Sequence, residues 1–126
     1  MSDNTQIARA IFDAFQNGDV EAARALLCED FSGSQNGGPA MGRDALLGFS
    51  AAVKAKVPDF RYEDTVCTAT DSGFVEEHTV RGTLPDGDEI NLALCVIGTV
   101  TDGQITELRE YLDTAGAAGL AKALGG

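Results

Sequence analysis

A glutamate near the end of the chain is the residue best suited to chemistry. Glu110 lies between Leu108 and Leu112, in a segment where apolar and polar residues alternate. Because side chains alternate across a β-strand, we expect these three residues to share one face of a sheet. A carboxylate on an apolar face loses hydration, which is costly unless the group is used. Glu110 is therefore predicted to be a general acid or base in a dry pocket, or else one half of an ion pair with Arg81 or with Arg109 of the partner subunit.

The strand predicted over residues 74–84 offers two sets of side chains for the same pocket. Its residues alternate, so only one set can share the face of Glu110. If Glu77 faces Glu110, the two carboxylates can share a proton near neutral pH. If His78 faces Glu110, the two form a His–acid general base. The pattern alone favours the set with His78, which is more apolar. One set is Val75, Glu77, Thr79 and Arg81, and the other is Phe74, Glu76, His78 and Val80.

The segment from residue 89 to residue 101 is apolar on both faces, which is typical of a strand covered on two sides. The predicted helices can cover only one of these faces. We therefore expect the other face to pack against a second copy, giving a homodimer through the sheet. The pocket should bind a small apolar molecule that carries oxygen. The residues expected to contact this molecule are Thr79, Arg81, Leu94, Leu108 and Leu112.

The period of the apolar residues changes along the chain from that of helices to that of strands, which predicts one α+β domain over residues 1–126. Helices are expected between the cap candidates Asn4 and Thr5 and the stop Asn17–Gly18, from Val20 to near Glu29–Asp30, and over 44–56. Strands are expected over 60–70, 74–84, 89–101 and 104–113. Residues 32–42 are rich in glycine and predict a loop, and residues 114–126 predict a short lid helix.

Composition excludes several classes of partner. The chain has 9 basic and 20 acidic residues and a formal net charge of -11, so it repels nucleic acids and anionic membranes. No secretory signal or spanning segment is visible in the sequence, and we expect a cytoplasmic protein. The three cysteines are predicted to be small buried hydrophobes. A single histidine supplies few ligands, so no metal and no cofactor are expected.

A series of short motifs resembles the nuclear-transport-factor-two-like superfamily along nearly the whole chain. The motifs are Asn17–Ala22, Gly42–Ala45, Leu84–Gly87, Asp102–Ile105 and Glu110–Asp113. Residues 76–113 are similar to limonene epoxide hydrolases, and the ending resembles SnoaL-like polyketide cyclases. The resemblance implies a cone-shaped fold in which N-terminal helices pack on a curved antiparallel sheet of four or more strands.

The resemblance also places catalytic positions. In the epoxide hydrolases an Asp–Arg–Asp set activates water and protonates the epoxide. The aspartate that activates water corresponds here to Glu110, the arginine to Glu77, and the aspartate that donates a proton to Thr79. Only the position of the base still holds a carboxylic acid, since the arginine and the proton-donating acid are replaced. The mechanism of the epoxide hydrolases therefore does not apply to this chain unchanged. This correspondence favours an inward Glu77, with His78 as the alternative.

Ketosteroid isomerases share the fold, and their tyrosine and two acids correspond to positions near Ile11, Gln35 and Val96, which cannot do that chemistry. SnoaL-like cyclases use an acid on the last strand, for which Glu110 is the nearest match. We therefore expect a cofactor-free isomerase, cyclase or hydrolase with Glu110, Glu77 and His78 as candidate catalytic residues. The alternative is a non-catalytic module of the same fold that binds a ligand or dimerises.

Overall fold

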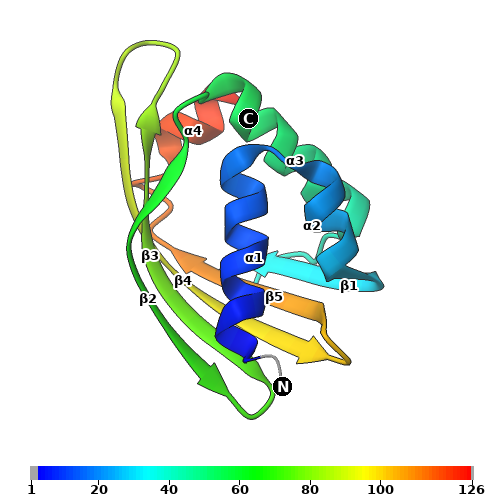
Figure 1. Cartoon of the computed structure of the whole chain (residues 1–126). Coiled ribbons are helices and arrows are strands. Elements are labelled where there is room, and N and C mark those ends of the chain that lie inside the picture. Colours follow the sequence, from blue (N-terminus) through cyan, green and yellow to red (C-terminus); the bar gives the residue numbers. More distant parts are fainter. Residues whose placement is uncertain (1–2, 126) are drawn as a thin grey trace.

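The computed structural model describes residues 3–125 and contains four helices and one five-stranded sheet within that range (Figure 1). The helices are α1 Asn4–Asn17, α2 Val20–Leu26, α3 Arg43–Lys56 and α4 Ala118–Ala123. The strands are β1 Leu27–Gln35, β2 Arg61–Thr70, β3 Gly73–Thr83, β4 Glu89–Thr101 and β5 Gln104–Leu112. The α+β class and the four predicted strands of the C-terminal half are confirmed.

The sheet is curved, and the helices lie on its concave side (Figure 1). Its strand order is β1-β5-β4-β3-β2, and every neighbouring pair is antiparallel except β1 and β5, which run parallel. The β4–β5 hairpin turns through Asp102 and Gly103, which both have positive φ (52° and 80°) as the expected two-residue turn requires. The fold is therefore the predicted cone of helices on a curved, open sheet.

Helix α1 ends at the predicted stop but begins slightly earlier than predicted. The side chain of Asp3 accepts a hydrogen bond from the Thr5 backbone N–H, so Asp3 rather than Asn4 or Thr5 is the N-cap. At the other end Gly18 takes a left-handed conformation (φ 69°) that closes the helix. The buried face of α1 then packs against the sheet. That face consists of Ile7, Ala8, Ile11, Phe12, Ala14 and Phe15.

Strand β1 replaces the end of the second predicted helix and the start of the predicted loop over 32–42, so both predictions are wrong there. Helix α2 ends at Leu26, and the chain is extended from Leu27 to Gln35, where it adds a parallel edge strand beside β5. Local composition disfavours a strand here, but pairing with β5 satisfies the backbone hydrogen bonds. The first buried residues of this strand, Leu27 and Phe31, anchor it in the core.

The register across β5, β4 and β3 fixes which residues face inward. Glu110 lies opposite Val96, which in turn lies opposite Glu76. The buried set on β3 is therefore the one that contains Glu76 and His78, while Glu77 is exposed on the other face. The expectation that Glu77, Thr79 and Arg81 face the cavity is wrong. The resemblance to the epoxide hydrolases assigned the residues of β3 to the cavity with an error of one residue, which places every side chain on the opposite face. The hydrophobic pattern identified the correct face.

Two apolar clusters form the core. One joins α1 to the middle of the sheet around Phe74, and the other joins Val57 and the outer part of β3 and β4 to α4. The three cysteines are free and only half-buried, so they do not fill the core as expected. Within residues 3–125 no helix is both long enough and apolar enough to span a membrane.

The packing of Phe74 on Gly98 gives a stability prediction. A Cβ at Gly98 would lie 2.3 Å from the Phe74 ring, which is fully buried. Gly98→Ala should therefore lower the free energy of unfolding by about 1–3 kcal/mol through overpacking. The control is Gly48→Ala in α3, where nothing lies within 4 Å of the added Cβ. That change should be neutral or stabilising by up to about 1 kcal/mol. Urea denaturation measures both, and equal effects would contradict the packing argument.

Candidate active site

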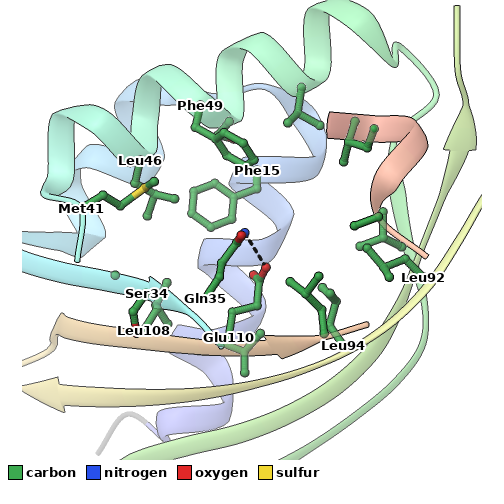
Figure 2. A pocket seen from close by; sticks show the side chains of 18 of the residues that line it. Phe15, Ser34, Gln35, Met41, Leu46, Phe49, Leu92, Leu94, Leu108 and Glu110 are labelled. Atoms are coloured by element: carbon green, nitrogen blue, oxygen red, sulfur yellow. Dashed lines mark hydrogen bonds between the residues drawn. The ribbon is translucent and has the colours of Figure 1, made fainter. Parts of the chain in front are cut away.

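A cavity of about 400 Å³ lies between the concave face of the sheet and the helices (Figure 2). Its volume is in the range of small-molecule sites. The walls are mostly apolar, with Phe15, Leu46 and Phe49 on the helical side. Three predicted contact residues, Leu94, Leu108 and Leu112, line the sheet side. The polar residues that line it are Ser34, Gln35, Ser50, Tyr62 and Glu110.

Glu110 projects into this cavity from β5 and is the only charged residue among the described residues that line it (Figure 2). Gln35, from the neighbouring strand β1, donates an Nε2–H hydrogen bond to Glu110 Oε1 at 3.0 Å. Burial raises the pKa of Glu110, while the charge of His78 and the bond from Gln35 lower it, and burial is the largest of these effects. The site thus holds a carboxylate that binds a proton more readily than a hydrated one.

Tyr62, from β2, lines the same cavity. Burial raises the pKa of Tyr62 well above its ordinary value, and the negative charges of Glu110 and Glu76 raise it further. The phenol therefore keeps its proton at neutral pH and can donate a hydrogen bond to an oxygen of a ligand. The cavity thus contains both a proton acceptor and a proton donor.

Behind Tyr62 lies a buried His–Glu pair. Glu76 and His78 are each 3% exposed, and 2.5 Å separates His78 Nδ1 from Glu76 Oε2. An ionised carboxylate can only accept, so Nδ1 carries a proton toward it. The other ring nitrogen, Nε2, is buried and has no hydrogen-bond partner. His78 therefore faces inward as the pattern suggested, but its direct partner is Glu76 rather than Glu110.

The structure separates the remaining predicted residues from the cavity. Glu77, Thr79 and Arg81 are on the outer face of β3, and Arg81 lies 3.9 Å from Glu89 in an ion pair. The sequence did not identify Gln35 as a site residue, because its segment was interpreted as a loop. It did not identify Tyr62 either, although the alternation of Phe60 and Tyr62 in a predicted strand indicates that they share a face. Glu76 was considered only as part of the alternative set. Among residues 3–125 no cluster of three or more His, Cys, Asp or Glu residues could hold a metal ion.

Comparisons with known proteins agree with this architecture. A family model described as the SnoaL-like domain matches residues 8–108. A candidate polyketide cyclase from Xanthomonas campestris pv. campestris is 29% identical with a TM-score of 0.78, over 89% of this chain and 91% of that one. IdmH, a candidate polyketide cyclase from Streptomyces antibioticus, is 21% identical with a TM-score of 0.80, over 98% and 99% of the two chains.

An M. tuberculosis epoxide hydrolase resembling the limonene epoxide hydrolases is also similar. It is 21% identical with a TM-score of 0.76, over 96% of this chain and 88% of that one. A search of curated proteins gives no match. The two likenesses at 21% identity show a shared fold and do not transfer a reaction.

The raised pKa of Glu110 predicts how stability depends on pH. The folded state binds this proton more readily than the unfolded state, so stability is lost as pH rises from the unfolded value of about 4.3 through the folded pKa. Glu110→Gln removes the buried charge, and near neutral pH it should raise the free energy of unfolding by roughly 0.5–2 kcal/mol. Below the unfolded value the gain should vanish.

Urea denaturation across this pH range measures the effect. Glu29→Gln is the matched control, because Glu29 is an exposed glutamate on β1 of the same sheet and lies outside the cavity. If Glu110→Gln were less stable than the native protein at neutral pH, the carboxylate would be a favourable structural partner rather than a strained one.

Proposed function

Because this chain belongs to the SnoaL-like domain family, we propose that it is a cofactor-free enzyme in which Glu110 acts as the general base on an apolar, oxygen-containing molecule. The family and the fold support an enzyme of this kind. The reaction class proposed is removal of a proton from carbon next to a carbonyl group, the first step of isomerisations and aldol-type cyclisations. Removal of a proton from water, which would begin a hydrolysis, needs the same base.

The single observation that carries this proposal is the position of the Glu110 carboxylate in an apolar cavity. A charge there loses hydration, and a pure carrier of apolar ligands gains nothing from that cost. A general base works best when its pKa lies near the working pH, and burial moves the pKa of Glu110 in that direction. The hydrogen bond from Gln35 occupies Oε1 and holds the carboxyl group, leaving Oε2 for the ligand.

Tyr62 is proposed to complete the reaction geometry. When Glu110 takes a proton from carbon, the C–H electron pair moves toward the carbonyl oxygen, which becomes negative. A neutral phenol in a dry cavity stabilises such an oxygen by donating a hydrogen bond. Glu110 and Tyr62 come from different strands and line the same cavity, so one ligand can contact both.

The lining also supports a class of ligand. Among the described residues of the cavity wall there is no lysine or arginine, and the one charge is negative. The whole chain is strongly acidic as well. An anionic ligand would meet repulsion without a counter-charge. We therefore propose that the substrate is uncharged, with its oxygen directed toward Tyr62 and its acidic hydrogen toward Glu110.

An octalone with its double bond between the β and γ carbons is a suitable probe. It is a neutral bicyclic ketone, and base removal of its α proton leads to the conjugated enone, which absorbs in the ultraviolet. The native protein should accelerate this conversion, and Glu110→Gln should reduce the rate by about 100-fold or more, the usual scale of a lost general base. Tyr62→Phe should reduce it less severely, because the cavity and the base remain.

Glu29→Gln is again the control and should match the native rate, since Glu29 is exposed and does not line the cavity. Circular dichroism of each variant checks that the fold is retained. A native rate no higher than the buffer rate, with octalone bound according to NMR, would favour the alternative of a non-catalytic ligand-binding module. Full activity of Glu110→Gln would show that another group is the base.

The partner proposed for the outer face of the sheet is a second copy of this chain. The helices lie on the concave side and leave the outer face uncovered (Figure 1). One row on this face crosses four strands and consists of Val66, Glu77, Cys95 and Tyr111, of which Val66 is 60% exposed and Tyr111 is 43% exposed. Ile97 lies in the neighbouring part of β4 and is half-buried. Exposed apolar groups on a sheet face are typical of an interface between subunits.

Light scattering after size-exclusion chromatography tests this partner. The native chain should have the mass of a dimer, and Tyr111→Asp should shift it toward the monomer, because a charge at the centre of the contact must be desolvated. Thr101→Asp, at the exposed end of β4, provides a substitution of the same charge outside this row. A native chain that remains monomeric at high concentration would contradict the proposal.

A further inference from the structure

Two consecutive residues at the end of β1 hold the part of β5 that carries Glu110. Gln35 donates its side-chain amide to Glu110 Oε1 (Figure 2). The backbone N–H of the next residue, Asn36, donates to the Glu110 carbonyl oxygen at 2.8 Å. The Asn36 side chain bonds both backbone groups of Leu112, donating to the carbonyl oxygen at 3.1 Å and accepting from the N–H at 3.0 Å. Four hydrogen bonds thus join residues 35–36 to residues 110–112.

The Asn36 side chain continues the pairing of β1 with β5 after the backbone of β1 has turned away. The paired residues of the two strands end at Gln35 and Glu110. Leu112 lies two residues further along β5, beyond this last pair. A carboxamide carries a donor and an acceptor side by side, as a peptide group does, so the Asn36 side chain supplies both partners that Leu112 needs. We call these two side-chain bonds the Asn36 clamp.

A tight turn brings the Asn36 side chain to this place. Asn36 and Gly37 have positive φ angles of 53° and 71°, and the Gly38 N–H donates to the Gln35 carbonyl oxygen at 2.9 Å. Two successive positive φ angles are typical of a type I′ turn, for which Asn-Gly is a preferred pair. Asparagine is one of the few residues with a side chain that adopts this conformation readily. The turn therefore reverses the chain at the residue whose side chain binds β5.

Gln35 needs this support because it lies at the end of an edge strand. Gln35 is exposed, so water competes for its amide. Holding a long side chain in one conformation also costs entropy. The ends of secondary-structure elements open more readily than their centres. Opening of the chain at Asn36 would therefore move the Gln35 amide away from Glu110 before the rest of β1 is affected.

We propose that Asn36 is a positioning residue of the active site, because its side chain fixes the end of β1 on β5 and thereby holds the Gln35 amide against the Glu110 carboxylate. The inference rests on the proposed function, in which Glu110 is the general base. Asn36 does not line the cavity, so it acts on the reaction through Gln35. A carboxylate that is held by one oxygen presents the other in a fixed direction, and reaction rates depend strongly on such orientation.

The side-chain amide signal of Gln35 tests the clamp without any substrate. An amide proton that donates to a carboxylate changes its chemical shift when that carboxylate is protonated. In nitrogen-15 NMR the Gln35 Nε2–H signal of the native protein should therefore move with pH, and it should stop moving in Glu110→Gln. Loss of the signal in Gln35→Ala identifies it. In Asn36→Gly the movement should fall several-fold. Glycine accepts the left-handed backbone, so this variant removes only the side-chain bonds.

The control is Gln104→Ala, at the other end of β5. The Gln104 side chain also donates to a backbone carbonyl, that of Ala25 at 3.2 Å, and it lies outside the cavity. This variant should keep the native movement of the Gln35 signal. Full movement in Asn36→Gly would overturn the proposal, as would a native signal that does not respond to pH. An equal loss in Gln104→Ala would indicate a general loosening of the sheet and would overturn it too.

A second variant retains half of the clamp. Asn36→Asp can still accept from the Leu112 N–H, but an ionised carboxylate cannot donate to the Leu112 carbonyl oxygen. The movement of the Gln35 signal should then lie between those of the native protein and Asn36→Gly. Circular dichroism checks that each variant is folded. Native movement in Asn36→Asp together with native movement in Asn36→Gly would show that the side chain at this position is not needed.

The octalone reaction measures the consequence for catalysis. Asn36→Gly should lower kcat roughly 10-fold and change KM little, because the carboxylate is no longer held in one orientation. Gln35→Ala should have a similar effect, and the double variant should lose no more than either single variant, since Asn36 acts through Gln35. Losses that multiply in the double variant would overturn this route. A higher KM with native kcat would mean that Asn36 only shapes the cavity, and would overturn the positioning role.

The two measurements separate this proposal from the proposed function. Absence of any enone with the native protein would count against Glu110 as the base. The Gln35 signal would still decide whether the Asn36 clamp holds the amide on the Glu110 carboxylate.

Discussion

The hydrogen bond between Gln35 and Glu110 is the interaction on which the site depends. It joins β1 and β5, which are the two strands of the sheet that lie farthest apart in the sequence. These two strands are also the only parallel pair in the described part of the sheet. The parallel register places Gln35 opposite Glu110, so the amide lies beside the carboxylate. A carboxylate in an apolar cavity without such a donor would protonate or turn toward water. The edge strand therefore keeps the Glu110 carboxylate in position.

Two hollows lie between the curved sheet and the helices, and two aromatic side chains separate them. Phe12 from α1 and Tyr62 from β2 meet edge to face, with ring centroids 5.3 Å apart, and close the gap between them. On one side the walls are leucine, phenylalanine and valine, and on the other they are polar. The same aromatic contact that holds α1 on the sheet thus separates a mostly apolar cavity from a mostly polar hollow lined by residues of α1, β2 and β3.

Much of the fold could be predicted from the sequence because the information is local. Alternating residues with Asp102–Gly103 at a turn define the β4–β5 hairpin, and Gly18 ends α1. Strand β1 could not be predicted in this way, because its pairing with β5 is long-range and its Ser and Gly residues favour a loop. Gln35 was missed for that reason. The face of β3 was correctly indicated by apolar alternation, whereas the resemblance shifted it by one residue.

Glu76 and Glu110 show why residue type alone does not assign a role. Both are glutamates on the concave face, and both lie opposite Val96 in the ladder, one on each side. Glu76 is paired with a histidine and reaches a polar cleft, while Glu110 has only a neutral amide as a direct partner and faces an apolar cavity. Loss of hydration favours the protonated form of the Glu110 carboxyl group and so raises its pKa. Two glutamates on one face of the sheet, two strands apart, therefore have different surroundings, and only Glu110 lies in the apolar cavity.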